Sequence, residues 1–207
     1  MENEIYNKIK ALADKYSKEL NKKIKERLVE MQKDDTSYYL IYRVLGISDK
    51  EGKLIDEYQN KGRFLYKYAG SFLEEAAILC FKYKFTSAKK VKIENKLGTR
   101  PKQFEIDLLS ELKAHEIKWR DATTDGDHIT KEHTRVKAIK NAGYTPVRVM
   151  FYYPQREQAQ KIQQTLETLY KGVDGEYYYG DNAWKYIEEY TGVNLLNILE
   201  NIAESRK

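Results

Sequence analysis

The chain has 207 residues, of which 37 are basic and 32 acidic, so its formal net charge is +5 with the histidines neutral. Eighteen tyrosines and an apolar content of 41% exclude an intrinsically disordered chain, and no apolar run approaches the roughly 20 residues of a membrane span. A single cysteine, Cys80, excludes a disulfide framework. Because the N-terminal stretch is also charged and lacks an apolar signal region, we expect a cytoplasmic protein.

The first part of the chain is predicted to be helical. Residues 1–33 place an apolar residue every three or four positions, which is the pattern of an amphipathic helix. Residues 62–85 repeat this pattern on a broader apolar face that includes Cys80, a residue we expect in the core. We expect the first helix to cover its own core, and a role in dimer formation is the alternative.

The pattern then becomes that of strands. Strands are predicted around residues 91–94, at 103–110 and at 114–120, with a helix at 129–141 and a further strand at 146–153. Because a helix between two strands permits a parallel crossover, whereas hairpins are antiparallel, the sheet is expected to be mixed.

Two helices, at 155–171 and 182–203, complete the prediction. The sequence thus predicts an α/β fold with a central mixed β-sheet flanked by helices. We expect one domain over residues 1–207, with an N-terminal helical part (1–60), a core (62–154) and C-terminal helices (155–207).

Positive charge is concentrated in one segment. Residues 81–102 hold eight basic residues against the single acid Glu94, which is +7, so the rest of the chain sums to −2. A smaller basic run follows at 128–140. Local runs of this kind are typical of a surface that binds nucleic-acid phosphates. The alternative is an edge strand whose lysines discourage pairing with other chains.

The most informative pattern lies in the second and third predicted strands. Strand alternation places Glu105 and Asp107 on one face of FEIDLLS, and Glu116 and Lys118 on one face of AHEIKWR. In a hairpin register that pairs Leu109 with Ala114, Asp107 lies opposite Glu116 and Glu105 lies opposite Lys118. Cross-strand neighbours have Cβ atoms only ~5 Å apart, so two carboxylates and a lysine would converge.

Two carboxylates that lie so near each other repel unless a positive charge lies between them. Mg²⁺ characteristically takes one or two carboxylates together with substrate phosphate and water, so Asp107 and Glu116 are candidate ligands. Lys118 would stabilise charge on a phosphate or position an attacking water. The pattern therefore predicts a phosphodiester hydrolase, and its alternative is a surface hairpin with one cross-strand salt bridge.

The arrangement resembles the PD-(D/E)xK nuclease superfamily, in which Asp107 matches the acid of the first motif and Glu116-Ile117-Lys118 matches (D/E)xK. Ile106 stands where that motif has proline. The resemblance implies a further glutamate on the helix before the sheet, for which Glu74 is preferred over Glu75 both as a catalytic residue and as a metal ligand.

The runs RFLYKYAGSFLEEA, HEIKWRDATTDGDHITKEHTR and RVMFYYP are similar to the ApaLI-type restriction endonucleases over most of the chain. This resemblance implies a type II restriction endonuclease that cleaves double-stranded DNA at a short palindrome with Mg²⁺. The family's namesake reads GTGCAC, and whether this chain reads the same site is left open. A palindrome cut in both strands implies a homodimer.

The basic runs supply the candidate DNA contacts, with Lys131 and Arg135 four residues apart on one helical face. For the histidines, an ordinary solvent-facing position is an equally good interpretation. The full set is Lys89, Lys90, Lys92, Arg100, Lys102, Arg120, His128, Lys131, His133 and Arg135. Two alternatives remain for the whole protein: a structure-selective nuclease of the junction-resolvase or repair type, and a non-catalytic DNA-binding protein.

Overall fold

The computed structural model describes residues 2–98, 100–120 and 126–206, with the backbone alone at residues 2 and 126–128. The chain divides into two compact units. One unit comprises residues 1–10 and 73–207, and the other comprises residues 11–72. Two long helices, α1 (Glu2–Met31) and α3 (Asp49–Lys84), contribute to both units.

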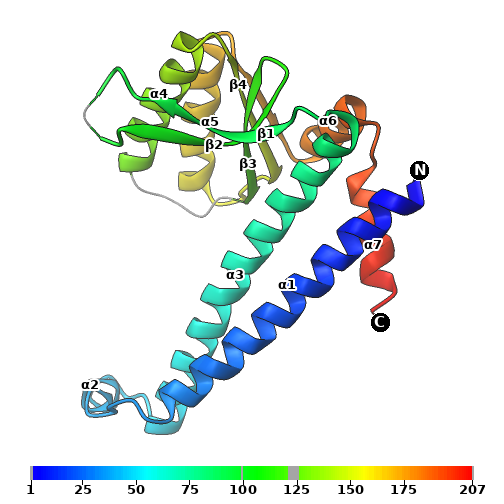
Figure 1. Cartoon of the computed structure of the whole chain (residues 1–207). Coiled ribbons are helices and arrows are strands. Elements are labelled where there is room, and N and C mark those ends of the chain that lie inside the picture. The colour runs from blue at the N-terminus through cyan, green and yellow to red at the C-terminus, as the bar shows by residue number, and fades with distance from the viewer. Residues whose placement is uncertain (1, 99, 121–125, 207) are drawn as a thin grey trace. The chain divides into compact units, whose positions relative to one another are not determined.

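The larger unit is built on a five-stranded mixed sheet (Figure 1). Its strands follow one another in chain order: β1 (Lys89–Glu94), β2 (Gln103–Ser110), β3 (Lys113–Arg120), β4 (Thr145–Tyr152) and β5 (Glu176–Tyr179). The pairs β1–β2 and β2–β3 are antiparallel, whereas β3–β4 and β4–β5 are parallel because a helix connects the two strands in each case. The predicted α/β fold with a mixed sheet is confirmed.

Helices cover both faces of this sheet. On one face lie α4 (Gly126–Asn141) and its neighbour α5 (Glu157–Lys171). Ala138 and Ile139 of α4 pack there against Phe104, Ile106 and Ala114. The other face is covered by the end of α3 and by α6 (Asp181–Thr191), which is followed by α7 (Leu195–Glu204). Burial on both sides agrees with the nearly continuous apolar run of β4, in which six consecutive residues, 146–151, are buried.

A buried histidine marks the second face. The His115 ring packs against Phe81 of α3 at a centroid distance of 4.6 Å and lies 2.9 Å from the Tyr186 hydroxyl oxygen of α6. Cys80 is fully buried in the same unit, as predicted.

A bulge in β2 alters the predicted alternation. Lys89 pairs with Leu109 and Val91 pairs with Ile106, so β2 has one more residue than β1 over this stretch. Phe104 and Ile106 therefore pack towards α4, whereas Leu108 pairs with His115, on the opposite face. The expectation that Phe104, Ile106 and Leu108 share one face is wrong. The extra residue of the bulge shifts the alternation of side chains by one position, so Leu108 points to the opposite face.

Several boundaries differ from the predicted ones for identifiable reasons. Helix α3 begins 13 residues before Gly62, at a capping box in which the Ser48 hydroxyl donates to Glu51 (2.7 Å) and the Glu51 N–H donates back (3.3 Å). The predicted helix 182–203 is two helices, because Gly192 is left-handed (φ 74°) and Asn194 caps α7 by accepting from the Asn197 N–H. The four-residue strand β5 was not predicted.

The smaller unit is helical, which confirms the predicted N-terminal helical region. It contains most of α1, the short helix α2 (Tyr39–Val44) and the first part of α3. Asp56 is buried there and accepts hydrogen bonds from the hydroxyls of Tyr38 (2.7 Å) and Tyr42 (3.0 Å), which join the segment around α2 to α3. Among the described residues, no helix combines the length and the apolar character needed to span a membrane.

Gly175, at the entry to β5, provides a test of packing. A Cβ atom at this position would lie 2.7 Å from the Pro146 carbonyl oxygen and 2.9 Å from that of Tyr170. We expect Gly175→Ala to lower the free energy of unfolding by about 1–3 kcal/mol. Gly70→Ala, in the middle of α3 where a Cβ meets open space, should instead raise it by up to ~1 kcal/mol. Thermal unfolding of both variants checks the opposite signs, and equal effects would contradict the packing at Gly175.

Candidate active site

Two carboxylates and a lysine converge where β2 and β3 run side by side. The Lys118 Nζ lies 2.6 Å from Glu116 Oε1 and 3.6 Å from Asp107 Oδ2. The side chains of Asp107 and Glu116 retain only 13% and 7% of their exposure, whereas that of Lys118 retains 31%. The two carboxylates are therefore largely buried, and Lys118 is the most solvent-exposed member of the cluster.

The predicted register accounts for this convergence only in part, because the β2–β3 ladder runs no farther than Leu108 and His115, and Glu105, expected opposite Lys118, is exposed. The ladder pairs Leu109 with Ala114 and Leu108 with His115, as the sequence suggested. At the next position the bulge in β2 turns Asp107, so that its Oδ2 accepts a hydrogen bond from the backbone N–H of Ile117 (2.9 Å). Bulges commonly re-aim side chains beside active sites, and this one fixes Asp107 against the strand that bears Lys118.

Glu116 is held as an anion by surrounding cations. Burial alone would raise its pKa, but the charges of Lys118, Arg135 and Arg148 outweigh burial and lower the pKa below its usual range. Arg135 reaches Glu116 Oε2 from α4 through its Nη1 atom. Lys118 responds in the opposite sense: burial favours its neutral form, but Glu116 and Asp107 raise its pKa, so it remains an ammonium ion.

The pKa of Asp107 is shifted in the opposite direction to that of Glu116. Burial and then the negative charge of Glu116 raise its pKa, and Lys118 only partly offsets them. A divalent cation bound here would favour the ionised form of Asp107. Asp107 and Glu116 supply the hard oxygen donors that Mg²⁺ prefers, in the number it usually takes from a protein. Within the described residues, no group of three or more His, Cys, Asp or Glu side chains is arranged to hold a metal ion.

A buried ionic network lies behind Glu116. Glu132 of α4 accepts from the Tyr170 hydroxyl (2.6 Å) and from Arg148 (3.2 Å), and it lies 3.6 Å from Arg135. Burial, and then the negative charge of Glu132, raise the pKa of Tyr170 well above its ordinary value, so the phenol stays protonated and donates. Arg135 thus bridges two anions, one in the network and one in the carboxylate cluster, and its orientation is fixed from both sides.

The two helix glutamates also have defined positions. Glu74 of α3 pairs with Lys90 of β1 (2.9 Å), and its charge contributes to the raised pKa of Asp107. Glu75 is half-buried on the same helix. The preference for Glu74 over Glu75, and the role of either residue, remain predictions.

The predicted DNA contacts are distributed over two parts of the larger unit. Most lie exposed on the edge strand β1 and the segment after it, or at the end of β3 and on α4: Lys89, Lys90, Lys92, Arg100, Lys102, Arg120, Lys131 and His133. The side chain of His128 lies outside the described residues. Arg135 is directed at Glu116 and Glu132 and keeps 23% of its side-chain exposure. Because β1 is an edge strand, its lysines also suit the alternative interpretation.

Sequence reasoning overlooked the residues that support the cluster. Arg135 was assigned to DNA, while Glu132, Arg148 and Tyr170 were given no role. Arg148 carried a usable signal, because a charged residue in the middle of the apolar strand PVRVMFYY must have a buried partner of opposite charge. The partner could not be identified from the sequence, because Glu132 lies on a different element.

Comparison with known proteins gives one match. The sequence model of a family described as ApaLI-like restriction endonuclease matches residues 1–204. No curated protein and no solved structure gives a significant match. The matched range includes every residue of the carboxylate cluster and of the network behind it.

Proposed function

The chain belongs to the ApaLI-like restriction endonuclease family and is therefore a deoxyribonuclease, and from this premise we propose a specific function and site. The protein is a type II restriction endonuclease that hydrolyses phosphodiester bonds of double-stranded DNA at a short palindrome, with Mg²⁺ as cofactor. The observation that carries the proposal is the convergence of Asp107, Glu116 and Lys118 on neighbouring strands.

Asp107 and Glu116 would hold the metal ion. Asp107 is turned to the site by the β2 bulge, and Glu116 is kept ionised by the cations around it. When bound there, Mg²⁺ would supply positive charge for the phosphate and lower the pKa of water. Glu74, which lies close enough to influence Asp107, is proposed as an additional carboxylate.

Lys118 acts on the phosphate as a cation. Its raised pKa argues against a role as a general base in the free enzyme, because the ammonium holds its proton. A fixed positive charge beside the reacting phosphate stabilises the negative charge that develops in the transition state. Arg135, Glu132 and Arg148 support this arrangement by fixing Glu116 from behind.

The topology supports a PD-(D/E)xK core. Three antiparallel strands, a helix and a fourth strand parallel to the third follow α3, with Asp107 on the second strand and Glu116 and Lys118 on the third. The exposed lysines and arginines of β1 and the following segment would bind backbone phosphates. We propose a homodimer, because a palindrome cut in both strands requires two active sites related by a two-fold axis.

Digestion of plasmid DNA tests this function. With Mg²⁺, the protein is expected to produce discrete fragments whose sequenced ends share one palindrome, and an excess of chelator should abolish them. Fragments with unrelated ends, or preferential cutting of branched DNA, would instead favour a structure-selective nuclease. The absence of any metal-dependent fragment would favour a protein that binds DNA without cutting it.

A further inference from the structure

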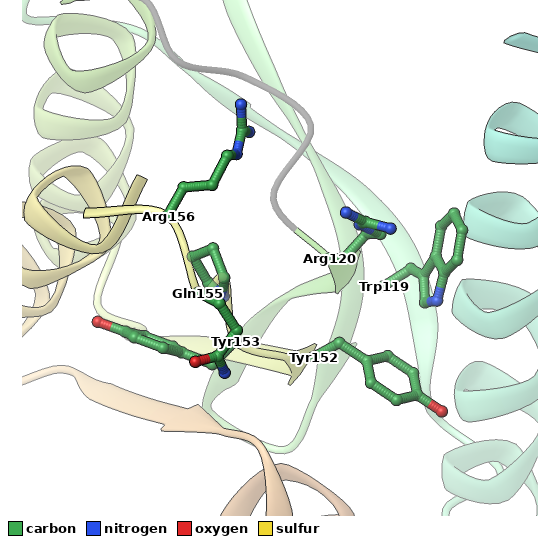
Figure 2. A pocket seen from close by; sticks show the side chains of 7 residues that line it. Trp119, Arg120, Tyr152, Tyr153, Gln155 and Arg156 are labelled. Carbon is green, nitrogen blue, oxygen red and sulfur yellow. The ribbon is translucent and has the colours of Figure 1, made fainter. Parts of the chain in front are cut away.

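A cleft of about 490 Å³ opens where β3 and β4 end (Figure 2). Three of the side chains that line it are aromatic and three carry polar end groups: Trp119, Tyr152, Tyr153, Arg120, Gln155 and Arg156. This volume falls within the range of small-molecule pockets. The carboxylate cluster does not line this cleft.

The cleft directly continues the catalytic strand. Lys118 pairs with Met150 across the parallel ladder, and the next recorded pair is Arg120 with Tyr152. Because side chains alternate along a strand, Glu116, Lys118 and Arg120 share one face, and Arg120 lies only ~7 Å beyond Lys118. A DNA strand with its scissile phosphate at Lys118 would therefore place a neighbouring nucleotide over the cleft.

The charges in the cleft suit that nucleotide. Among the described residues that line it none is acidic, whereas two are arginines. In Figure 2, Arg120, at the end of β3, and Arg156, beyond β4, lie apart from each other. Guanidinium and amide groups are the side-chain groups that most often form paired hydrogen bonds with the edges of guanine and adenine.

The aromatic rings give the cleft an apolar wall. Tyr152 is 50% exposed, and the ring of Tyr153 packs on that of Tyr179 at a centroid distance of 4.4 Å. The Arg120 guanidinium lies over the Trp119 ring, 5.6 Å from its centroid. Rings held in place by such packing and left accessible to solvent can stack on or border a nucleobase.

From these observations, and on the basis of the proposed function, we propose that the cleft binds the nucleotide next to the scissile phosphate. Gln155 and Arg156 hydrogen-bond the edge of its base, and Arg120 pairs with the adjacent phosphate. Gln155 and Arg156 are therefore specificity-determining residues, whereas the cluster at Lys118 carries the chemistry.

A library of DNA duplexes with randomised sequence, cut in the presence of Mg²⁺ and sequenced at the new ends, tests this assignment. We expect Gln155→Ala and Arg156→Ala to reduce discrimination at one base pair of each half-site by about 5- to 150-fold and to leave the other positions unchanged. Gln164→Ala, which removes an exposed amide farther along α5, should cut with the wild-type sequence profile.

A DNA-binding measurement provides a second readout for any variant that does not cut DNA. The same substitutions are combined with Lys118→Ala, and the duplexes that remain bound are sequenced. A sequence preference altered at one base pair supports the proposal. A preference identical to that of the parent at every position, by cutting or by binding, overturns it. Absence of cleavage by the wild-type protein would contradict the proposed function itself, which separates the two failures.

Discussion

Replacing Lys118 by alanine is expected to lower the rate of DNA cleavage by about 10²- to 10³-fold. The Nζ atom lies 2.6 Å from Glu116 and 3.6 Å from Asp107, so its removal takes away the cation shared by both carboxylates. The charge that develops on the phosphate then has no lysine to stabilise it. Glu116 keeps its contact with Arg135, so the fold and the basic surface that we propose binds DNA should be retained.

The comparison that makes this result specific is Lys137→Ala. Lys137 is an exposed lysine of α4, so its removal changes the net charge equally without touching the cluster. Cleavage rates on one plasmid and binding of one labelled duplex should be measured for both variants. Cutting at the wild-type rate by Lys118→Ala, or an equal loss of cleavage in both variants, would contradict the assigned role.

The second large effect is expected at Glu132. Its side chain retains 2% exposure and contacts Arg148, which retains 3%, as well as Arg135 and Tyr170. Glu132→Ala leaves buried positive charge without its partner, so we expect the free energy of unfolding to fall by about 3–5 kcal/mol. Cleavage should fall as well, because Arg135 loses one of the two anions that orient it towards Glu116.

Two further variants determine whether this cost comes from buried charge. Tyr170→Phe removes only a hydroxyl donor and should cost about 1–2 kcal/mol. Glu157→Ala breaks a salt bridge whose carboxylate is 82% exposed and should cost less than ~1 kcal/mol. Chemical unfolding of the three variants should give this order. A cost at Glu132 no greater than that at Glu157 would show that the network does not stabilise the fold.

Local patterns in the sequence were sufficient to predict most of the fold. Alternation and turn residues gave β2, β3 and the pairing of Leu109 with Ala114, which is the register that brings Asp107 near Glu116. The helix between β3 and β4 gave the mixed sheet. These features depend on residues close together in the chain, where periodicity is informative.

What the sequence could not provide depends on contacts between distant elements. The β2 bulge follows from pairing with β1, and it changes the faces of Phe104 and Ile106 relative to Leu108. Strand β5 has only four residues and is held by pairing with β4. Arg135 contacts Glu116 on β3 and Glu132 one turn earlier on α4. The sequence of the helix alone does not distinguish such a paired arginine from one that is exposed to solvent.

The most direct test of the central claim is the dependence of plasmid cleavage on Mg²⁺ concentration in Asp107→Asn and Glu105→Gln. Both variants remove one negative charge from β2, but Glu105 is exposed and Asp107 lies in the carboxylate cluster. We predict that Glu105→Gln cuts with the Mg²⁺ dependence of the wild type, whereas Asp107→Asn is inactive or requires far more Mg²⁺. Cleavage by Asp107→Asn with the wild-type rate and Mg²⁺ dependence would contradict the proposed active site.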